Sequence, residues 1–216
     1  MKTVKIALST LVLAVLFNHP SVLADGNPGK AKKMATKAAA TLKVDPNKST
    51  LHWTGKKVTG EHTGNVKISK GVLTVDGNKL VGGTFDIDMK SIVNTDLTDA
   101  SYNAKLVGHL KDEDFFSVEK HPVATFKITK VEPMASAKAG EPNYTITGNL
   151  TIKGITNPVT FPATVKLTGN QAEAAAKFDI DRTKWDIKYG SGLVGTAADK
   201  VIYDNFTIDM KVFAAK

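Results

Sequence analysis

The chain has 216 residues, of which 42% are hydrophobic, 23% are charged and none is cysteine. This composition is typical of a globular protein and too apolar for an intrinsically disordered one. The absence of cysteine excludes disulfide scaffolds, thiolate zinc sites and cysteine nucleophiles. The formal net charge of +8 suggests an anionic partner. The position of this charge along the chain weakens the suggestion, as described below.

Residues 1–24 have the pattern of a secretory signal peptide. Lys2 and Lys5 precede an apolar stretch over 6–17, and Ala24 ends a small-residue cleavage motif. As a helix, this stretch would rise only about 18 Å, less than the roughly 30 Å hydrocarbon core of a bilayer. The pattern therefore predicts cleavage near Ala24 and a periplasmic or secreted protein without a transmembrane span.

Residues 25–43 form a Lys/Ala-rich segment that we predict to be a flexible tail. It carries five lysines against Asp25, whereas from Val44 onward basic residues exceed acidic ones by only two. A nucleic-acid-binding domain would carry a concentrated basic face of its own, so we expect no nucleic-acid partner. Weak contact between the tail and anionic lipid headgroups is the alternative to a solvated linker. A single domain is expected over 44–216.

Alternation of apolar and polar residues dominates this domain. Over 81–90 it places Val81, Phe85, Ile87 and Met89 on one face of a predicted strand. The same pattern predicts strands over 144–152, 159–167 and 206–212, and weaker ones over 51–58, 63–69, 71–76, 123–131 and 174–181. Turn residues at 76–78, 154–158 and 169–170 join successive strands closely, which favours antiparallel pairing.

The fold class follows from these long strands. One interruption, between Asp99 and Lys111, repeats apolar residues at a spacing of four and predicts one or two helical turns, and 132–142 is predicted to be a loop. Strands with one apolar face close most economically into a barrel, because closure leaves no exposed edge. We predict an all-β protein, an extended eight-stranded antiparallel β-barrel with one short helical interruption. A sandwich is the alternative.

No residue pattern predicts catalysis or a metal centre. The histidines of the domain lack the spacing of a zinc site, the acidic run 112–114 lacks the pattern of a calcium loop, and Ser191 has no nucleophile elbow. We therefore expect no enzyme activity, no catalytic residue, no metal and no cofactor. An enzyme that acts on a bound amphiphile through His52, Asp181 or Arg182 is the competing hypothesis.

Large aromatic residues occupy the apolar phase of separate strands. Either they form a plain hydrophobic core, or they line a cavity for a lipid-like guest. Small residues in the same phase, Gly83, Gly148 and Ala163, leave space that neighbouring side chains either fill or leave open.

Several motifs, in a fixed order, resemble the YceI-like family, which is also described as polyisoprenoid-binding or lipid-binding. They are HWTG over 52–55, GTFDIDMKSIVNT over 83–95, LKDEDFF over 110–116, HPVATF over 121–126, GNLTIKGIT over 148–156 and DRTKW over 181–185. The matching segments cover nearly all of 44–213, and their order makes the resemblance more specific than any single motif.

The resemblance implies an exported, lipocalin-like barrel, often a homodimer, whose apolar channel holds an isoprenoid, quinone-like or fatty-acid-type amphiphile for transport or storage. A packed barrel that acts as a stress-response or protein-interaction module without a lipid ligand is the alternative. Phe115 and Phe116 could plug one end, and Arg182 could hold a polar head group or anchor a turn. The predicted ligand-binding residues are Trp53, Phe85, Ile87, Phe115, Phe116, Phe126, Phe161, Phe178, Arg182, Trp185 and Phe206.

Overall fold

A computed structural model of the protein describes residues 39–135 and 137–216. The predicted signal peptide and most of the predicted tail lie outside these residues. The described chain forms nine strands: β1 (Ala40–Val44), β2 (Thr50–Lys57), β3 (Gly60–Asp76), β4 (Lys79–Asn94), β5 (Val123–Pro133), β6 (Tyr144–Ile152), β7 (Ile155–Thr168), β8 (Gln171–Asp181) and β9 (Ile202–Ala215). It also contains helix α1 (Ala100–Lys111) and three 3₁₀ turns, η1 (Arg182–Trp185), η2 (Gly192–Val194) and η3 (Ala198–Lys200).

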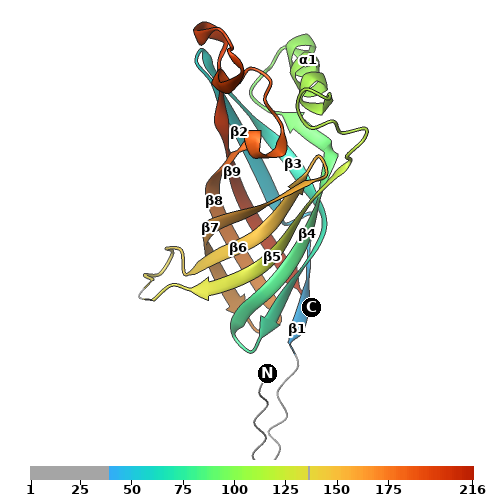
Figure 1. The fold of residues 1–216 in the computed structure, drawn as a ribbon. Helices are drawn as coiled ribbons and strands as arrows, with labels where there is room; N and C mark the ends of the chain where they lie inside the picture. The colour runs from blue at the N-terminus through green and yellow to red at the C-terminus, as the bar shows by residue number, and fades with distance from the viewer. Residues whose placement is uncertain (1–38, 136) are drawn as a thin grey trace, which may run out of the picture. The chain divides into compact units, whose positions relative to one another are not determined.

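The strands form one closed antiparallel barrel (Figure 1). Both β1 and β2 pair with β3 on one side and with β9 on the other. They therefore occupy one position in the barrel, interrupted at 45–49, and the nine strands fill eight positions. Each remaining strand pairs with its neighbour in sequence. The predicted eight-stranded antiparallel barrel is confirmed.

The two ends of the barrel differ. Helix α1 and the 3₁₀ turns lie at one end, which we call the α1 end, whereas β1 and the C-terminal end of β9 lie at the other, the β1 end (Figure 1). Asp99 caps the N-terminus of helix α1, and its carboxylate accepts hydrogen bonds from the backbone N–H groups of Ser101 and Tyr102. Its twelve residues exceed the one or two turns expected, and none of them is buried.

Strand β1 corrects the expected boundary of the tail. Ala40–Lys43 pair with β3, and Leu42 is only 1% exposed, although residues up to 43 were predicted to be flexible. The alternation in this segment covers only five residues. Such a short alternation is hard to recognise between lysines and alanines, whose composition is that of a solvated tail.

A second correction concerns Val81, which was expected to share a face with Phe85. Val81 is exposed and Leu80 is buried instead. The register against β3 shifts here, because Thr74 pairs with Gly82 while Val75 pairs with Leu80. The extra residue is a bulge that reverses the side-chain alternation.

Three tight turns set the other registers. Gly77–Asn78, Lys153–Gly154 and Gly169–Asn170 each join strands through two residues. Their glycines have positive φ angles of 58°, 76° and 59° respectively, which glycine adopts without a steric penalty. The reversal expected over 154–158 is shorter than predicted, since β7 already begins at Ile155.

Candidate functional site

An apolar cavity occupies the half of the barrel nearer the α1 end. Its volume is about 180 Å³. All strands from β2 to β9 contribute side chains to its wall, and only Gly55, Arg182 and Tyr203 of the lining residues are not apolar. The wall consists of Leu51, Trp53, Gly55, Val66, Ile68, Phe85, Ile87, Met89, Ile92, Leu110, Phe115, Phe116, Ala124, Phe126, Leu150, Ile152, Val159, Phe161, Phe178, Ile180, Arg182, Ile187, Ile202, Tyr203, Phe206, Ile208 and Met210.

Four phenylalanine rings form a continuous row across the barrel, which we call the Phe row. The ring centroids of Phe85 and Phe126 are 6.4 Å apart, and those of Phe126 and Phe161 are 5.6 Å apart. Phe161 and Phe178 stack face to face, with centroids 4.0 Å apart and planes inclined by 4°. Since the rings come from β4, β5, β7 and β8, the row links strands that are distant in sequence.

The small residues near these rings do not enlarge the cavity. A Cβ atom on Gly83 would lie 2.8 Å from the carbonyl oxygen of Val72, and one on Gly148 would lie 2.5 Å from Cε2 of Phe126. Ala163 is buried and does not belong to the cavity wall. The space that these residues leave is therefore filled by their neighbours.

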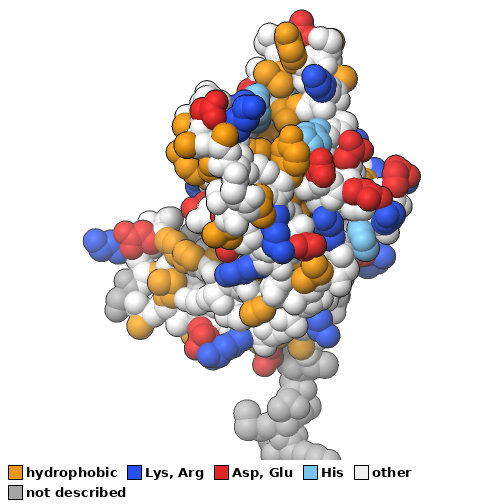
Figure 2. Space-filling model, turned by 45° about the horizontal axis from the view of Figure 1, so that its top comes forward, with side chains coloured by type: hydrophobic (Ala, Val, Ile, Leu, Met, Phe, Trp, Pro, Cys, Tyr) orange, Lys and Arg blue, Asp and Glu red, His pale blue; other side chains and the backbone are white. Residues whose placement is uncertain are grey.

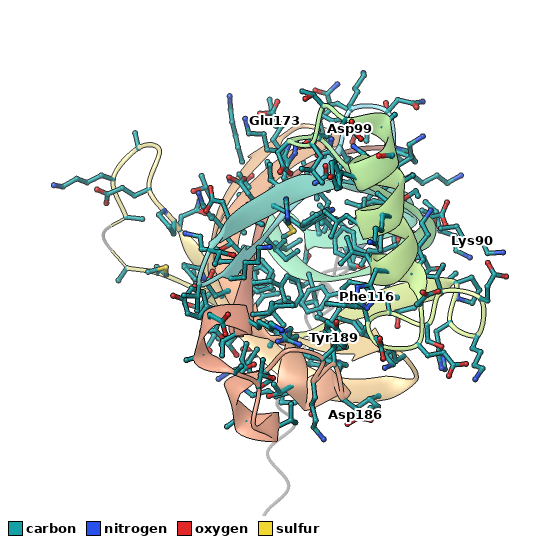
Figure 3. All side chains as sticks on the ribbon, turned by 90° about the horizontal axis from the view of Figure 1, so that it is seen from above. Lys90, Asp99, Phe116, Glu173, Asp186 and Tyr189 are labelled. Atoms are coloured by element: carbon teal, nitrogen blue, oxygen red, sulfur yellow. The ribbon has the colours of Figure 1, made fainter. Side chains whose placement is uncertain are left out.

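The cavity reaches the surface at the α1 end. Phe116, which lines the cavity, is partly exposed. Seen with this end turned toward the reader, hydrophobic side chains line the recess there (Figure 2). Viewed along the barrel, Phe116 and Tyr189 lie at the opening (Figure 3).

Aromatic contacts connect the two sides of this opening. The ring of His109 in α1 meets Phe115 edge-on at 4.9 Å and Tyr189 edge-on at 4.6 Å, measured between centroids. Phe115 and Tyr189 are 5.5 Å apart. The segment after α1 and the loop after η1 are thus packed against each other at the mouth.

Ten of the eleven predicted ligand-binding residues line this cavity. They are Trp53, Phe85, Ile87, Phe115, Phe116, Phe126, Phe161, Phe178, Arg182 and Phe206. Trp185 is absent from the wall; it is 1% exposed, and its indole Nε1 donates a hydrogen bond to the carbonyl oxygen of Leu150 at 3.1 Å. The structure brings the ten side chains together, and ligand binding by them stays a prediction.

Arg182 is used as an anchor for the chain at the mouth. Its Nε donates to the carbonyl oxygen of Tyr203 (3.2 Å), Nη1 to that of Ile187 (2.8 Å) and Nη2 to that of Ile202 (3.0 Å). Nη2 also lies 3.5 Å from Oδ1 of Asp204. Of the two roles expected for Arg182, these contacts match the turn anchor.

The surroundings of Arg182 also affect its charge. Burial lowers the pKa of its guanidinium, and the neighbouring Asp204 and Asp181 act in the opposite direction. The side chain of Asp181 accepts hydrogen bonds from both the backbone N–H and the hydroxyl of Thr183. Arg182 is the chain's only arginine, and a planar guanidinium suits several fixed carbonyl groups better than a lysine does. That uniqueness is the sequence signal for its role.

Several lining residues were missed by the sequence analysis. Leu110, Ile187, Ile202 and Tyr203 come from α1, from the irregular segment after η1 and from the start of β9. Period-two alternation does not extend into helices and loops, so it does not predict which way most of these side chains point. Within 39–135 and 137–216, no cluster of three or more His, Asp or Glu side chains could hold a metal ion.

Comparisons with known proteins agree with this fold. Residues 42–214 match the model of the YceI-like domain family. UPF0312 protein YE1254 of Yersinia enterocolitica is 37% identical over 95 residues, which are 40% of this chain and 45% of that protein. UPF0312 protein PA0423 of Pseudomonas aeruginosa is 42% identical over 81 residues, or 38% of each chain. The matches thus span less than half the length of these curated relatives.

Solved structures show the same architecture. BcnA of Burkholderia cenocepacia is 27% identical and superposes with a TM-score of 0.61 over 80% of this chain and 99% of its own. A polyisoprenoid binding domain from Saccharophagus degradans has a TM-score of 0.56 at 16% identity, over 82% of this chain and 98% of that one, and shares the fold. With four-fifths of its length matched in one unbroken segment, the chain belongs to the YceI-like domain family.

Proposed function

We propose that this protein binds a lipid-like amphiphile by enclosing its hydrocarbon tail in the cavity at the α1 end. The observation that carries the proposal is a hollow whose wall, apart from three of its residues, consists of apolar side chains. Water in such a space finds few hydrogen-bond partners, so an apolar guest is the better occupant. The polyisoprenoid named for the Saccharophagus degradans domain supports a tail of this class.

Burial of the tail provides affinity without any reactive group. Each buried methylene contributes about 0.8 kcal/mol, so ten give about 8 kcal/mol before the costs of association. Isoprenoid, quinone-like and fatty-acid-type molecules share such a tail. Because nothing in this mode of binding requires turnover, the proposed role is transport or storage rather than catalysis.

The setting of this role is part of the proposal. The signal-like residues 1–24 support export to the periplasm or the exterior, where a carrier would shield tails from water. No helix within the described residues is long and apolar enough to cross a membrane. A homodimer and a membrane contact through the basic tail stay predictions.

The alternative of a fully packed interior agrees with one half of the barrel but not with the other. Near the β1 end, side chains such as Leu42, Leu73 and Val212 are buried and do not belong to the cavity wall. Near the α1 end, the cavity does not fit a solid core. The hollow half therefore favours a binding role over a purely structural module.

The test is native mass spectrometry of the protein purified from its own host without detergent, combined with solvent extraction and analysis of the extract. We expect a bound amphiphile in one-to-one ratio, and binding of an apolar fluorescent probe that a fatty acid displaces. Ala124→Phe fills the cavity from its wall and should abolish probe binding. Its control, Ala175→Phe, alters an exposed alanine of β8 and should leave binding unchanged. A consistently empty protein that binds no probe refutes the proposal.

A further inference from the structure

The cavity stops at the same level on several strands. On β7 the wall includes Val159 and Phe161 but not the buried Ala163. On β8 it includes Ile180 and Phe178 but not the buried Ala176. Beyond Phe85 on β4 and Phe126 on β5, the next inward residues toward the β1 end, Gly83 and Ile128, also do not contribute. The Phe row therefore marks the depth at which the hollow ends.

Small residues follow the rings of the row on several strands. Gly83, Ala163 and Ala176 each stand two positions from a ring of the row, on the side of the β1 end. The ring of Phe126 lies over Gly148. A side chain on Gly148 would occupy the position of this ring, so the missing Cβ lets the row lie across the barrel.

The side chains beyond the Phe row are buried, and they do not belong to the cavity wall. Leu42 and Leu73 there are 1% and 2% exposed, and Leu80, Ile146 and Val165 are also buried. Protein interiors of this kind are close-packed and yield little to an added chain. A tail that reaches the row must therefore displace stacked rings to go further.

The length of the hollow can be gauged along β9. Its lining residues run from Ile202 to Met210, a span of about 20 Å along the barrel axis for a strand of typical rise and tilt. This is the depth available to a tail between the mouth and the Phe row. A longer tail would leave its remaining units outside the protein.

We propose that the Phe row is the determinant of tail length, so that affinity stops rising once a tail is long enough to reach the row. This inference rests on the proposed function. It assigns the guest's end to the Phe row and its polar head to the mouth between α1 and the loop that holds Tyr189. The selectivity is set by four side chains rather than by the length of the barrel.

The experiment measures the dissociation constants of saturated fatty acids from hexanoic to eicosanoic acid by displacement of an apolar fluorescent probe. For the natural sequence we expect affinity to rise about fourfold per added methylene up to a break, and then to stay level. In Phe161→Ala and Phe178→Ala, each of which removes a ring from the row, the break should move to longer acids. Phe213→Ala is the matched control, because Phe213 does not belong to the cavity wall, and it should leave the break in place.

The outcomes separate the two proposals. If no acid of any length binds, the proposed function fails. If short acids bind but affinity rises without a break, or if the break stays where it is in both alanine variants, the Phe row does not limit tail length. Circular dichroism checks folding, and Phe161→Leu, a milder change, replaces an alanine variant that does not fold. In Phe161→Leu we expect a smaller shift of the break in the same direction. If the break does not shift in this variant, the inference is overturned.

Discussion

The ring of Phe126 lies over Gly148 of the neighbouring strand, in the space that any side chain at that position would occupy. A Cβ atom on Gly148 would lie 2.5 Å from Cε2 of this ring and 2.7 Å from the carbonyl oxygen of Lys127. By crossing β6 at this point, Phe126 comes within 5.6 Å of Phe161 on β7. One missing side chain thus allows the Phe row to continue across a strand that contributes no ring to it.

Gly148→Ala should therefore destabilise the protein. The added methyl forces the ring or the backbone to move, and overpacking of this kind costs about 1–3 kcal/mol. Gly82→Ala is the matched control, because its Cβ would lie 3.8 Å from Cβ of Thr74, an ordinary contact. That variant should be neutral or more stable by up to about 1 kcal/mol, as alanine is less flexible than glycine. Urea denaturation measures both, and equal free energies of unfolding would contradict the overlap described.

The two tryptophans of the chain offer an optical test of where a tail lies. Trp53 lines the cavity, whereas Trp185 is buried outside its wall. In Trp185→Phe, the remaining fluorescence comes from Trp53, and a brominated fatty acid should quench it strongly. In Trp53→Phe, the same acid should quench the emission of Trp185 much less.

The unbrominated acid of equal length serves as the control for changes caused by binding alone. Trp185→Phe also removes the hydrogen bond to the carbonyl oxygen of Leu150, so its folding is verified by circular dichroism. Equal quenching of both tryptophans would contradict the expected position of the tail against Trp53.

Acid should weaken the α1 end through Asp96. Partial burial raises the pKa of this carboxyl, but hydrogen bonds from the backbone N–H of Thr63 and from the side chains of His62 and Asn94 outweigh it, so the pKa is lowered. A group whose pKa is lower in the folded state adds stability above its unfolded pKa of about 3.9 and loses it as the pH falls through the folded value.

We therefore expect Asp96→Asn to be less stable than the natural sequence near pH 7, and the difference to shrink below about pH 4. Free energies of unfolding measured by urea denaturation across this range give the result. Asp76→Asn, at the exposed last residue of β3, is the control and should follow the natural sequence throughout. A constant difference between Asp96→Asn and the natural sequence at all pH values would show that the carboxyl's charge is not responsible.

Alternation in the sequence predicts which side chains face into the barrel, but not how deep the hollow is. Phe85, Phe126, Phe161 and Phe178 were assigned inward because strand geometry fixes a period of two. The same argument applies to Ala163, which is packed. Whether an inward residue meets space or another side chain depends on the sizes of residues across the barrel, and these come together only in three dimensions.

Irregular backbone explains the remaining errors. Val81 was misassigned because one extra residue at the bulge reverses the phase. Trp185 lies in a 3₁₀ turn, where alternation does not predict which way a side chain points. Local composition cannot distinguish the two tryptophans, since both match motifs of the same family.

Arg182 should stabilise the mouth through geometry as well as charge. Its guanidinium donates hydrogen bonds to the carbonyl oxygens of Ile187, Ile202 and Tyr203. An ammonium group cannot reach all three together. Arg182→Lys keeps the charge, yet we expect a loss of about 2–4 kcal/mol, because buried acceptors remain unpaired. Hydrogen exchange should accelerate at the amide of Ile202, which is bonded to Gly190. Lys177→Met, at an exposed pair with Asp209, should change stability by less than about 1 kcal/mol. If Arg182→Lys is as stable as the natural sequence and exchanges no faster, these three contacts do not hold the mouth in place.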